Sequence, residues 1–172
     1  DILNAILNLA ILVQHGAEGS ISIFPPREHC NSQGVNDMGC TPEFLPGYRP
    51  ITDSNALSSL ADEWDIDSLN FDSDNPANDL VANCANGNIK FLHIAGEDPV
   101  HSYYKGAEIK NALQIVPFLV VQDVYMTETA KLADIILPTT TSVEKEGSFT
   151  NMTRHVQKVM PAIPPQYQSR TD

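Results

Sequence analysis

The sequence predicts a three-layer α/β domain with a mainly parallel sheet, and three observations lead to this prediction. Of the 172 residues, 42% are hydrophobic and 19% are charged, which is typical of a folded chain long enough for one domain. Nearly continuous apolar runs at 89–95, 118–122 and 134–137 are typical of strands that are buried on both faces. Helix-like segments at 106–114 and 127–133 separate these runs, as crossovers between parallel strands do.

The N-terminal half predicts helices around one long irregular stretch. Residues 2–14 place apolar side chains on a broad helical face, and His15-Gly16 follows as a stop signal. Ser20 to Phe24 is a short β-prone run. Residues 25–53 hold five prolines and three glycines without a sustained period, which is usual for a functional loop or a linker. Within them, residues 25–50 are expected to form a long loop that faces a cofactor and is poorly ordered or held by crystal contacts.

Four further segments complete the expected order of elements. Residues 54–64 and 76–86 predict short helices, and the acidic stretch from Asp62 to Asp74 between them is expected at the surface. After Pro138, residues 148–151 and 155–159 predict short extended segments. Residues 1–172 are thus interpreted as a single α/β domain, with a strand–helix–strand–helix–strand core at 88–138.

Charge and cysteine content exclude several classes of function. The formal net charge of −12 repels phosphate backbones, and the basic residues are scattered, so we expect no nucleic-acid partner. Three cysteines without a CxxC spacing favour reduced thiols in the cytoplasm. No apolar run approaches the roughly 20 residues that span a bilayer, so no membrane insertion is expected. The first residues lack a Met, which suggests an internal fragment of a longer chain.

Polar residues follow each of the three predicted strands, where parallel α/β sheets bind ligands. They are Glu97-Asp98, Gln122-Asp123 and the hydroxyl-rich run from Thr139 to Thr141. Carboxylates can accept hydrogen bonds from ribose or guanine, whereas hydroxyls and helix N-terminal amides suit a pyrophosphate. The alternative is that Asp98 and Thr127 only cap helices and that Asp123 only shapes a turn.

Several familiar motifs are absent. No GxGxxG or GxxxxGK[ST] run supports ordinary NAD or ATP binding, and no metal-binding motif is present. A lone His-Cys pair such as His29-Cys30 more often has a structural role than a metal-binding one. Glu144 and Glu146 are more readily explained by a solvated loop than by acid–base catalysis.

Four stretches together resemble the molybdopterin oxidoreductases, most of all formate dehydrogenase catalytic subunits and the large iron–sulfur subunit of bacterial NADH–quinone oxidoreductases. The family's R-G-x-N-x-Q-G-x-x-D-M-G…P-G-Y pattern is matched by residues 27–48, and its M-G-E-N/D-P turn by residues 94–99. Its V-Q-D-x-F-x-T-E-T-A run is matched by residues 121–130. Its A-D-V-V-L-P…E-K-D-G-T-F-T-N…V-Q pattern is matched by residues 133–157.

The resemblance implies a Rossmann-like part of a catalytic subunit that binds the guanosine-diphosphate arm of a molybdopterin guanine dinucleotide carrying Mo or W. Arg27 falls where formate dehydrogenases place a catalytic arginine beside the metal and the substrate anion. The metal ligand and an Fe–S cluster are expected outside this chain, so the isolated fragment should be inactive. Expected partners are the remaining domains of the same subunit and other electron-transfer subunits, in the cytoplasm or on the cytoplasmic face of a membrane. The residues expected to contact the dinucleotide are Glu97, Asp98, Gln122, Asp123, Thr140 and Ser142.

One departure from the pattern bears on the substrate. Glu28 and His29 replace the usual Gly-Gln after the arginine, which puts a carboxylate near the expected anion site and favours the NADH–quinone type over formate. The alternative function is a degenerate structural module of a respiratory complex that binds no cofactor.

Overall fold

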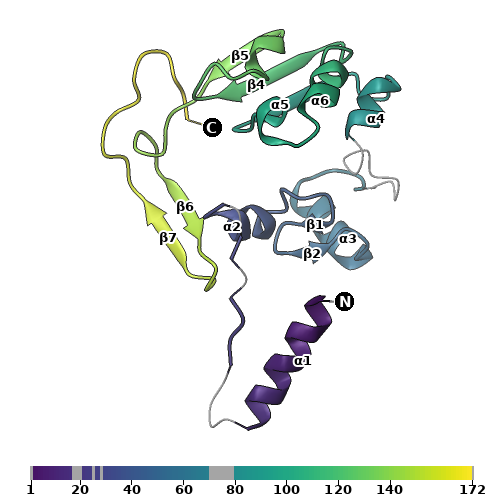
Figure 1. Cartoon of the computed structure of the whole chain (residues 1–172), viewed down its shortest axis with the longest axis vertical. Coiled ribbons are helices and arrows are strands. Elements are labelled where there is room, and N and C mark those ends of the chain that lie inside the picture. The colour runs from purple at the N-terminus through teal and green to yellow at the C-terminus, as the bar shows by residue number, and fades with distance from the viewer. Residues whose placement is uncertain (1, 17–20, 25, 28, 70–79, 172) are drawn as a thin grey trace.

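The computed structural model describes residues 2–16, 21–24, 26–27, 29–69 and 80–171, and it contains a three-stranded parallel sheet, which lies at the top of Figure 1. The chain has the mixed helix and strand content of an α/β fold. In chain order the elements are α1 (Ile2–His15), α2 (Ser32–Asp37), β1 (Phe44–Leu45), β2 (Arg49–Pro50), α3 (Ser54–Glu63), α4 (Leu80–Ala85), β3 (Leu92–Ala95), α5 (Pro99–Ser102), α6 (Gly106–Leu113), β4 (Leu119–Asp123), the 3-10 helix η2 (Ala130–Leu132), β5 (Ile135–Pro138), β6 (Gly147–Thr150) and β7 (Val156–Val159).

The parallel sheet confirms the central prediction. Strands β3, β4 and β5 lie side by side in chain order, and both pairs are parallel, with Ile94 opposite Val121 and Val121 opposite Ile136. Apolar residues of β3 and β4 face α6 and η2 and form the main core. That core consists of Ile94, Ile109, Leu113, Leu119, Val121 and Ala130.

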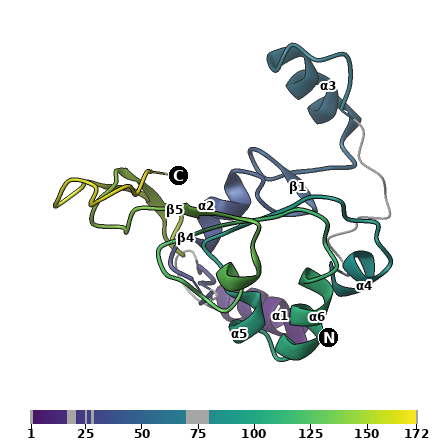
Figure 2. The same cartoon turned by 90° about the horizontal axis from the view of Figure 1, so that it is seen from above.

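Within the described residues, the helices that pack against this sheet lie on one face of it (Figure 2). On the opposite face Phe91, Phe118, Ile135 and Leu137 remain exposed, and no helix of the described residues joins a hydrophobic cluster there. The second helical layer expected from the sequence is therefore missing from the described residues. The reason is topological: β3, β4 and β5 are adjacent in chain order, so right-handed crossovers place both connections on the same face.

The stretch at 25–53 is more regular than the sequence predicted. It contains α2 and the antiparallel pair β1–β2, and Leu45 packs against Ala56 and Leu60 of α3. Gly39 makes the return turn possible, because its φ of +74° lies in the left-handed region and a Cβ there would approach Pro46 N to 2.6 Å. The expectation of an irregular stretch is wrong for these elements, and the expected poor order stays a prediction.

The remaining element predictions have mixed outcomes. The helices at 2–14 and 54–64 are confirmed as α1 and α3, and the extended segments after Pro138 form the antiparallel hairpin β6–β7. The helix at 76–86 is confirmed as α4 from Leu80 onwards, and the earlier residues lie outside the described part. The strand at 20–24 is wrong for residues 21–24, which have no partner strand in the described chain.

Helix α1 presents an apolar surface that the rest of the described chain leaves uncovered. None of its residues is buried, and Ile2 and Leu12 are 81% and 71% exposed. Exposed apolar surfaces of this kind normally contact another protein segment. No helix among the described residues is long and apolar enough to span a bilayer.

Candidate functional site

The carboxyl ends of the three parallel strands meet at one edge, as the sequence predicted. The backbone N–H of Gly96, after β3, donates to the carbonyl of Gln122 at 2.8 Å. The N–H of Thr139, after β5, donates to the carbonyl of Asp123 at 3.2 Å. These bonds bring the loop that carries Glu97 next to the end of β4 and the start of the hydroxyl-rich run.

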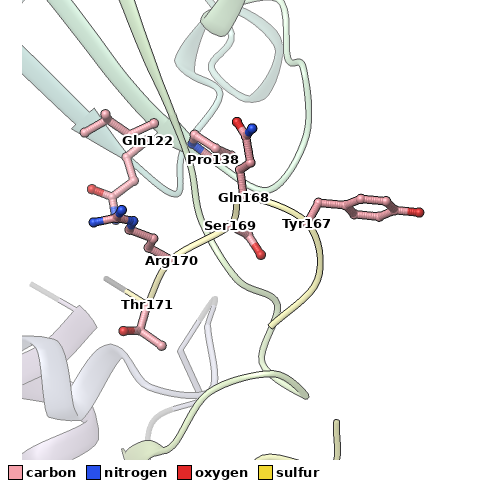
Figure 3. Close-up of a pocket in the computed structure, with 8 residues that line it drawn as sticks. Gln122, Pro138, Tyr167, Gln168, Ser169, Arg170 and Thr171 are labelled. Carbon is pink, nitrogen blue, oxygen red and sulfur yellow. The ribbon is translucent and has the colours of Figure 1, made fainter. Parts of the chain in front are cut away.

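The C-terminal segment 167–171 returns to the same edge. Arg170 pairs with Thr139 in a parallel bridge: its N–H donates to Pro138 O, and its carbonyl accepts from Thr140 N–H at 3.1 Å. A cavity of about 800 Å³ lies between this segment and the strand ends (Figure 3). Its lining comprises Gln122, Leu137, Pro138, Tyr167, Gln168, Ser169, Arg170 and Thr171.

Gln122 and Arg170 are among the polar side chains of this cavity that have no partner within the described residues. Figure 3 shows the guanidinium of Arg170 lying toward the amide of Gln122, while Tyr167 points away. Arg170 makes no ion pair within the described chain, and the amide of Gln122 makes no hydrogen bond there. An unpaired guanidinium beside an amide can bind a phosphoryl or carboxylate group. Sequence reasoning missed Arg170, because only the long-range bridge to Thr139 brings it to the sheet edge.

The two aspartates predicted to bind a dinucleotide also have structural roles. Asp98 Oδ1 accepts from both the N–H and the hydroxyl of Thr129, at 3.1 and 2.6 Å. Burial alone would raise the pKa of Asp98, but the bonds from Thr129 outweigh it and hold the pKa below its ordinary value. Asp123 Oδ1 accepts from the N–H groups of Val124 and Tyr125 and shapes the turn after β4. The turn suggested for Asp123 is thus present, whereas the side chain of Asp98 makes no capping hydrogen bond to α5 and binds Thr129 instead. Ligand contacts by both residues stay predictions.

Thr140 and Ser142 occupy different surroundings. Thr140 is 1% exposed, and its hydroxyl is buried with no partner among the described residues. Ser142 is exposed and lines a separate cavity of about 250 Å³ with Asn31 and Lys145. The structure therefore does not bring Ser142 to the Gln122 cavity.

Glu144 is a buried structural carboxylate, which corrects the expectation of a solvated loop. It is only 7% exposed and accepts from Thr141 N–H at 2.7 Å, Thr141 Oγ1 at 2.9 Å and Gln166 N–H at 3.0 Å. The bonds from Thr141, foremost its backbone N–H, lower the pKa of Glu144. The carboxylate thus joins the segment after β5 to the C-terminal segment that lines the cavity.

Arg27 lies in another part of the chain, away from the strand ends. It lines a cavity of about 600 Å³ together with His29 and Cys30, and with Arg154 from the turn between β6 and β7. A bond of 2.9 Å from Thr150 N–H to Asn31 Oδ1 fixes this turn beside α2. The complete described lining is Leu3, Leu7, Ile23, Arg27, His29, Cys30, Gln33, Thr150, Asn151, Met152 and Arg154, and it includes no acidic residue.

No group of three or more His, Cys, Asp or Glu side chains among the described residues is placed to hold a metal ion. Cys30, Cys40 and Cys84 are free, and burial raises the pKa of the Cys84 thiol. The residues at the sheet edge do suit a phosphorylated ligand, since an unpaired guanidinium, an unpartnered amide and a buried hydroxyl without a partner lie close in the fold.

The sheet and its polar carboxyl edge define an α/β protein of the class that binds ligands beyond the strand ends. The family model for molybdopterin oxidoreductases matches residues 1–172, and the chain belongs to this family. It is 38% identical over 96% of its length to the F420-dependent formate dehydrogenase subunit alpha of Methanocaldococcus jannaschii, of which it covers 24%.

Two further relatives widen this comparison. Formate dehydrogenase H of Escherichia coli is 31% identical over the whole chain, which covers 24% of that protein. The NADPH-Fe(3+) oxidoreductase subunit alpha of Geobacter sulfurreducens is also 31% identical, and the chain covers 20% of it. The chain thus spans about a quarter or less of the curated relatives it matches.

Proposed function

We propose that this chain is the part of a formate-dehydrogenase-like oxidoreductase subunit that holds the guanosine-diphosphate arm of a molybdopterin guanine dinucleotide. The observation that carries the proposal is the cavity at the carboxyl edge of the sheet, where the Arg170 guanidinium and the Gln122 amide have no partner among the described residues. Membership of the molybdopterin oxidoreductase family supports a pterin ligand.

Each residue at this edge has a defined task in the proposal. Arg170 pairs with a phosphoryl oxygen, because a guanidinium donates two parallel hydrogen bonds to such a group. Gln122 binds the guanine or ribose through its side-chain amide, which can donate and accept hydrogen bonds. Glu97 and Asp123 accept from ribose hydroxyls or guanine N–H groups. Asp98, which also holds Thr129 in place, and Thr140 complete the proposed contact set at this edge. Ser142 lines the separate cavity and is proposed to contact the dinucleotide from there.

The substrate is proposed to bind at Arg27. When bound, the cofactor supplies two-electron transfer at Mo or W. Arg27 holds the substrate anion by charge-assisted hydrogen bonds, and residues 25–50 form the cofactor-facing wall. Formate is the preferred substrate, because several relatives carry formate dehydrogenase names, in contrast to the NADH–quinone type that Glu28 and His29 favoured.

The rest of the machinery is proposed to lie outside these residues. The metal ligand, the Fe–S cluster and the electron-transfer partners belong to the remaining domains and to other subunits, in the cytoplasm. Residues 1–172 are proposed to work as one α/β unit that is inactive alone. The exposed apolar surface of α1 supports packing against such further domains.

The test is cofactor retention in the full-length protein that contains this chain. Gln122→Ala and Arg170→Ala are expected to lower the guanine nucleotide and the Mo or W recovered per polypeptide by several-fold, because each removes a contact at the cavity. Lys158→Ala, another exposed cation that pairs only at the surface with Glu146, is the matched control and should leave recovery unchanged.

Two results would contradict the proposal. Wild-type protein without pterin or metal would favour the degenerate structural module instead. Full retention in both cavity variants would mean that the dinucleotide does not lie at this edge.

A further inference from the structure

Arg154 shares the cavity of Arg27 although the two residues are far apart in the sequence. Arg27 precedes α2, and Arg154 lies in the turn between β6 and β7. Neither guanidinium makes an ion pair within the described chain. The chain has a formal net charge of −12, but two arginines without an ion pair to any described residue gather at this cavity, and its described lining holds no acidic side chain.

The turn that carries Arg154 is fixed by its own hydrogen bonds. Asn151 Oδ1 accepts from Thr153 N–H, Thr153 Oγ1 and His155 N–H, at 3.0, 2.7 and 3.0 Å. The neighbouring Thr150 N–H donates to Asn31 Oδ1, which attaches the turn to the segment that follows Arg27. These hydrogen bonds therefore hold Arg154 in a defined position beside the cavity.

The backbone of Arg154 is strained. Its φ of +63° lies in the left-handed region, which residues with a Cβ adopt rarely and glycine or asparagine adopt readily. Arginine is therefore expected to make this turn less stable than glycine or asparagine would. Strain of this kind is often found where a side chain has a functional task.

We propose that Arg154 is a second substrate-binding cation, which with Arg27 forms a two-arginine site for a small carboxylate or similar oxyanion. The role of Arg27 as the first cation rests on the proposed function. Two guanidiniums from separate segments can each donate to a different oxygen of the anion. Of the described polar side chains beside them, His29 and Asn151 can add donors without adding negative charge, whereas the amide of Gln33 donates to Asp37 Oδ1 at 2.7 Å.

The proposal is tested in the full-length protein with its cofactor, using sodium formate as the probe. Arg154→Gly and Arg154→Asn remove the cation and relieve the strained φ. Both are expected to raise the melting temperature, while the Kd for formate by calorimetry and the KM each rise about tenfold, as for the loss of one charged hydrogen bond. The value of kcat should change little. Asp65→Gly, at another positive φ of 54° outside the cavity, is the control that relieves strain with unchanged formate binding.

The outcomes separate this inference from the proposed function. Stabilised Arg154 variants that bind formate as the wild type does would overturn the inference, as would wild-type protein that binds no formate. If Arg27→Ala loses binding while the Arg154 variants keep it, Arg27 acts alone. Loss of formate binding in Arg154 variants of a protein that holds no pterin or metal would support the anion site and contradict the proposed cofactor.

Discussion

Replacing Gly34 by alanine tests how the Arg27 cavity is assembled. A Cβ at position 34 would lie 2.3 Å from Oδ1 of Asn31 and 3.0 Å from its Cγ, so the side chain of Asn31 must move. Asn31 does not cap α2; its Oδ1 accepts from the N–H of Thr150 instead. Gly34→Ala is therefore expected to break the bond that joins α2 to β6.

The size of the effect follows from two opposing contributions. Thr150 is 8% exposed, so its N–H would lose its partner in a nearly buried position, which costs about 1–3 kcal/mol. Alanine in a helix is favoured over glycine by about 0.5–1 kcal/mol. The free energy of unfolding should therefore fall by about 0.5–2 kcal/mol, although glycine to alanine in a helix ordinarily raises it.

The assay is equilibrium urea unfolding of the 172-residue chain. Asn31→Ala should destabilise by about 1–3 kcal/mol, because it removes the same acceptor without the helical gain. In the Asn31→Ala background the clash disappears, so adding Gly34→Ala should then raise stability by about 0.5–1 kcal/mol. A Gly34→Ala variant more stable than wild type, or a double variant less stable than Asn31→Ala, would refute the reasoning.

Three further predictions address other parts of the fold. Gly106→Ala should lower the melting temperature strongly, since a Cβ there would lie 2.1 Å from the backbone carbonyl oxygen of Val100. An unchanged melting temperature in differential scanning calorimetry would mean that the backbone relaxes around the added methyl group. Leu113→Ala should lower the free energy of unfolding by about 2–5 kcal/mol, because the side chain is 2% exposed in the core; a urea titration that gives less than about 1 kcal/mol would contradict this. The lowered pKa of Glu144 means that its stabilising effect is present above the ordinary value of 4.5 and is lost as the pH falls through the folded value. Glu144→Gln should therefore flatten the dependence of the melting temperature on pH below about 4.5, and an unchanged pH dependence would assign that acid sensitivity to other carboxylates.

The parallel sheet and the edge at which polar residues gather could both be predicted from the sequence alone. Apolar runs at 89–95, 118–122 and 134–137 were sufficient because a strand between turn signals needs only local residues to be recognised. Their chain order also fixes the edge, since parallel strands end together. The motif around Arg27 is also recognisable from neighbouring residues alone. Its resemblance to the molybdopterin oxidoreductases is confirmed by the family match over residues 1–172.

Which side chains share a cavity depends on long-range contacts that the folded chain makes. The backbone bridge between Arg170 and Thr139 places Arg170 beside Gln122. The hydrogen bond between Asn31 and Thr150 places the turn that carries Arg154 beside Arg27. Glu144 is buried and joins two segments because the backbone N–H of Gln166, in the C-terminal segment, donates to it. Each of these contacts joins segments that are distant in the chain, so no local period or motif encodes it. The single helical layer has the same origin, because the number of covered faces depends on strand order and crossover hand rather than on the composition of any one strand.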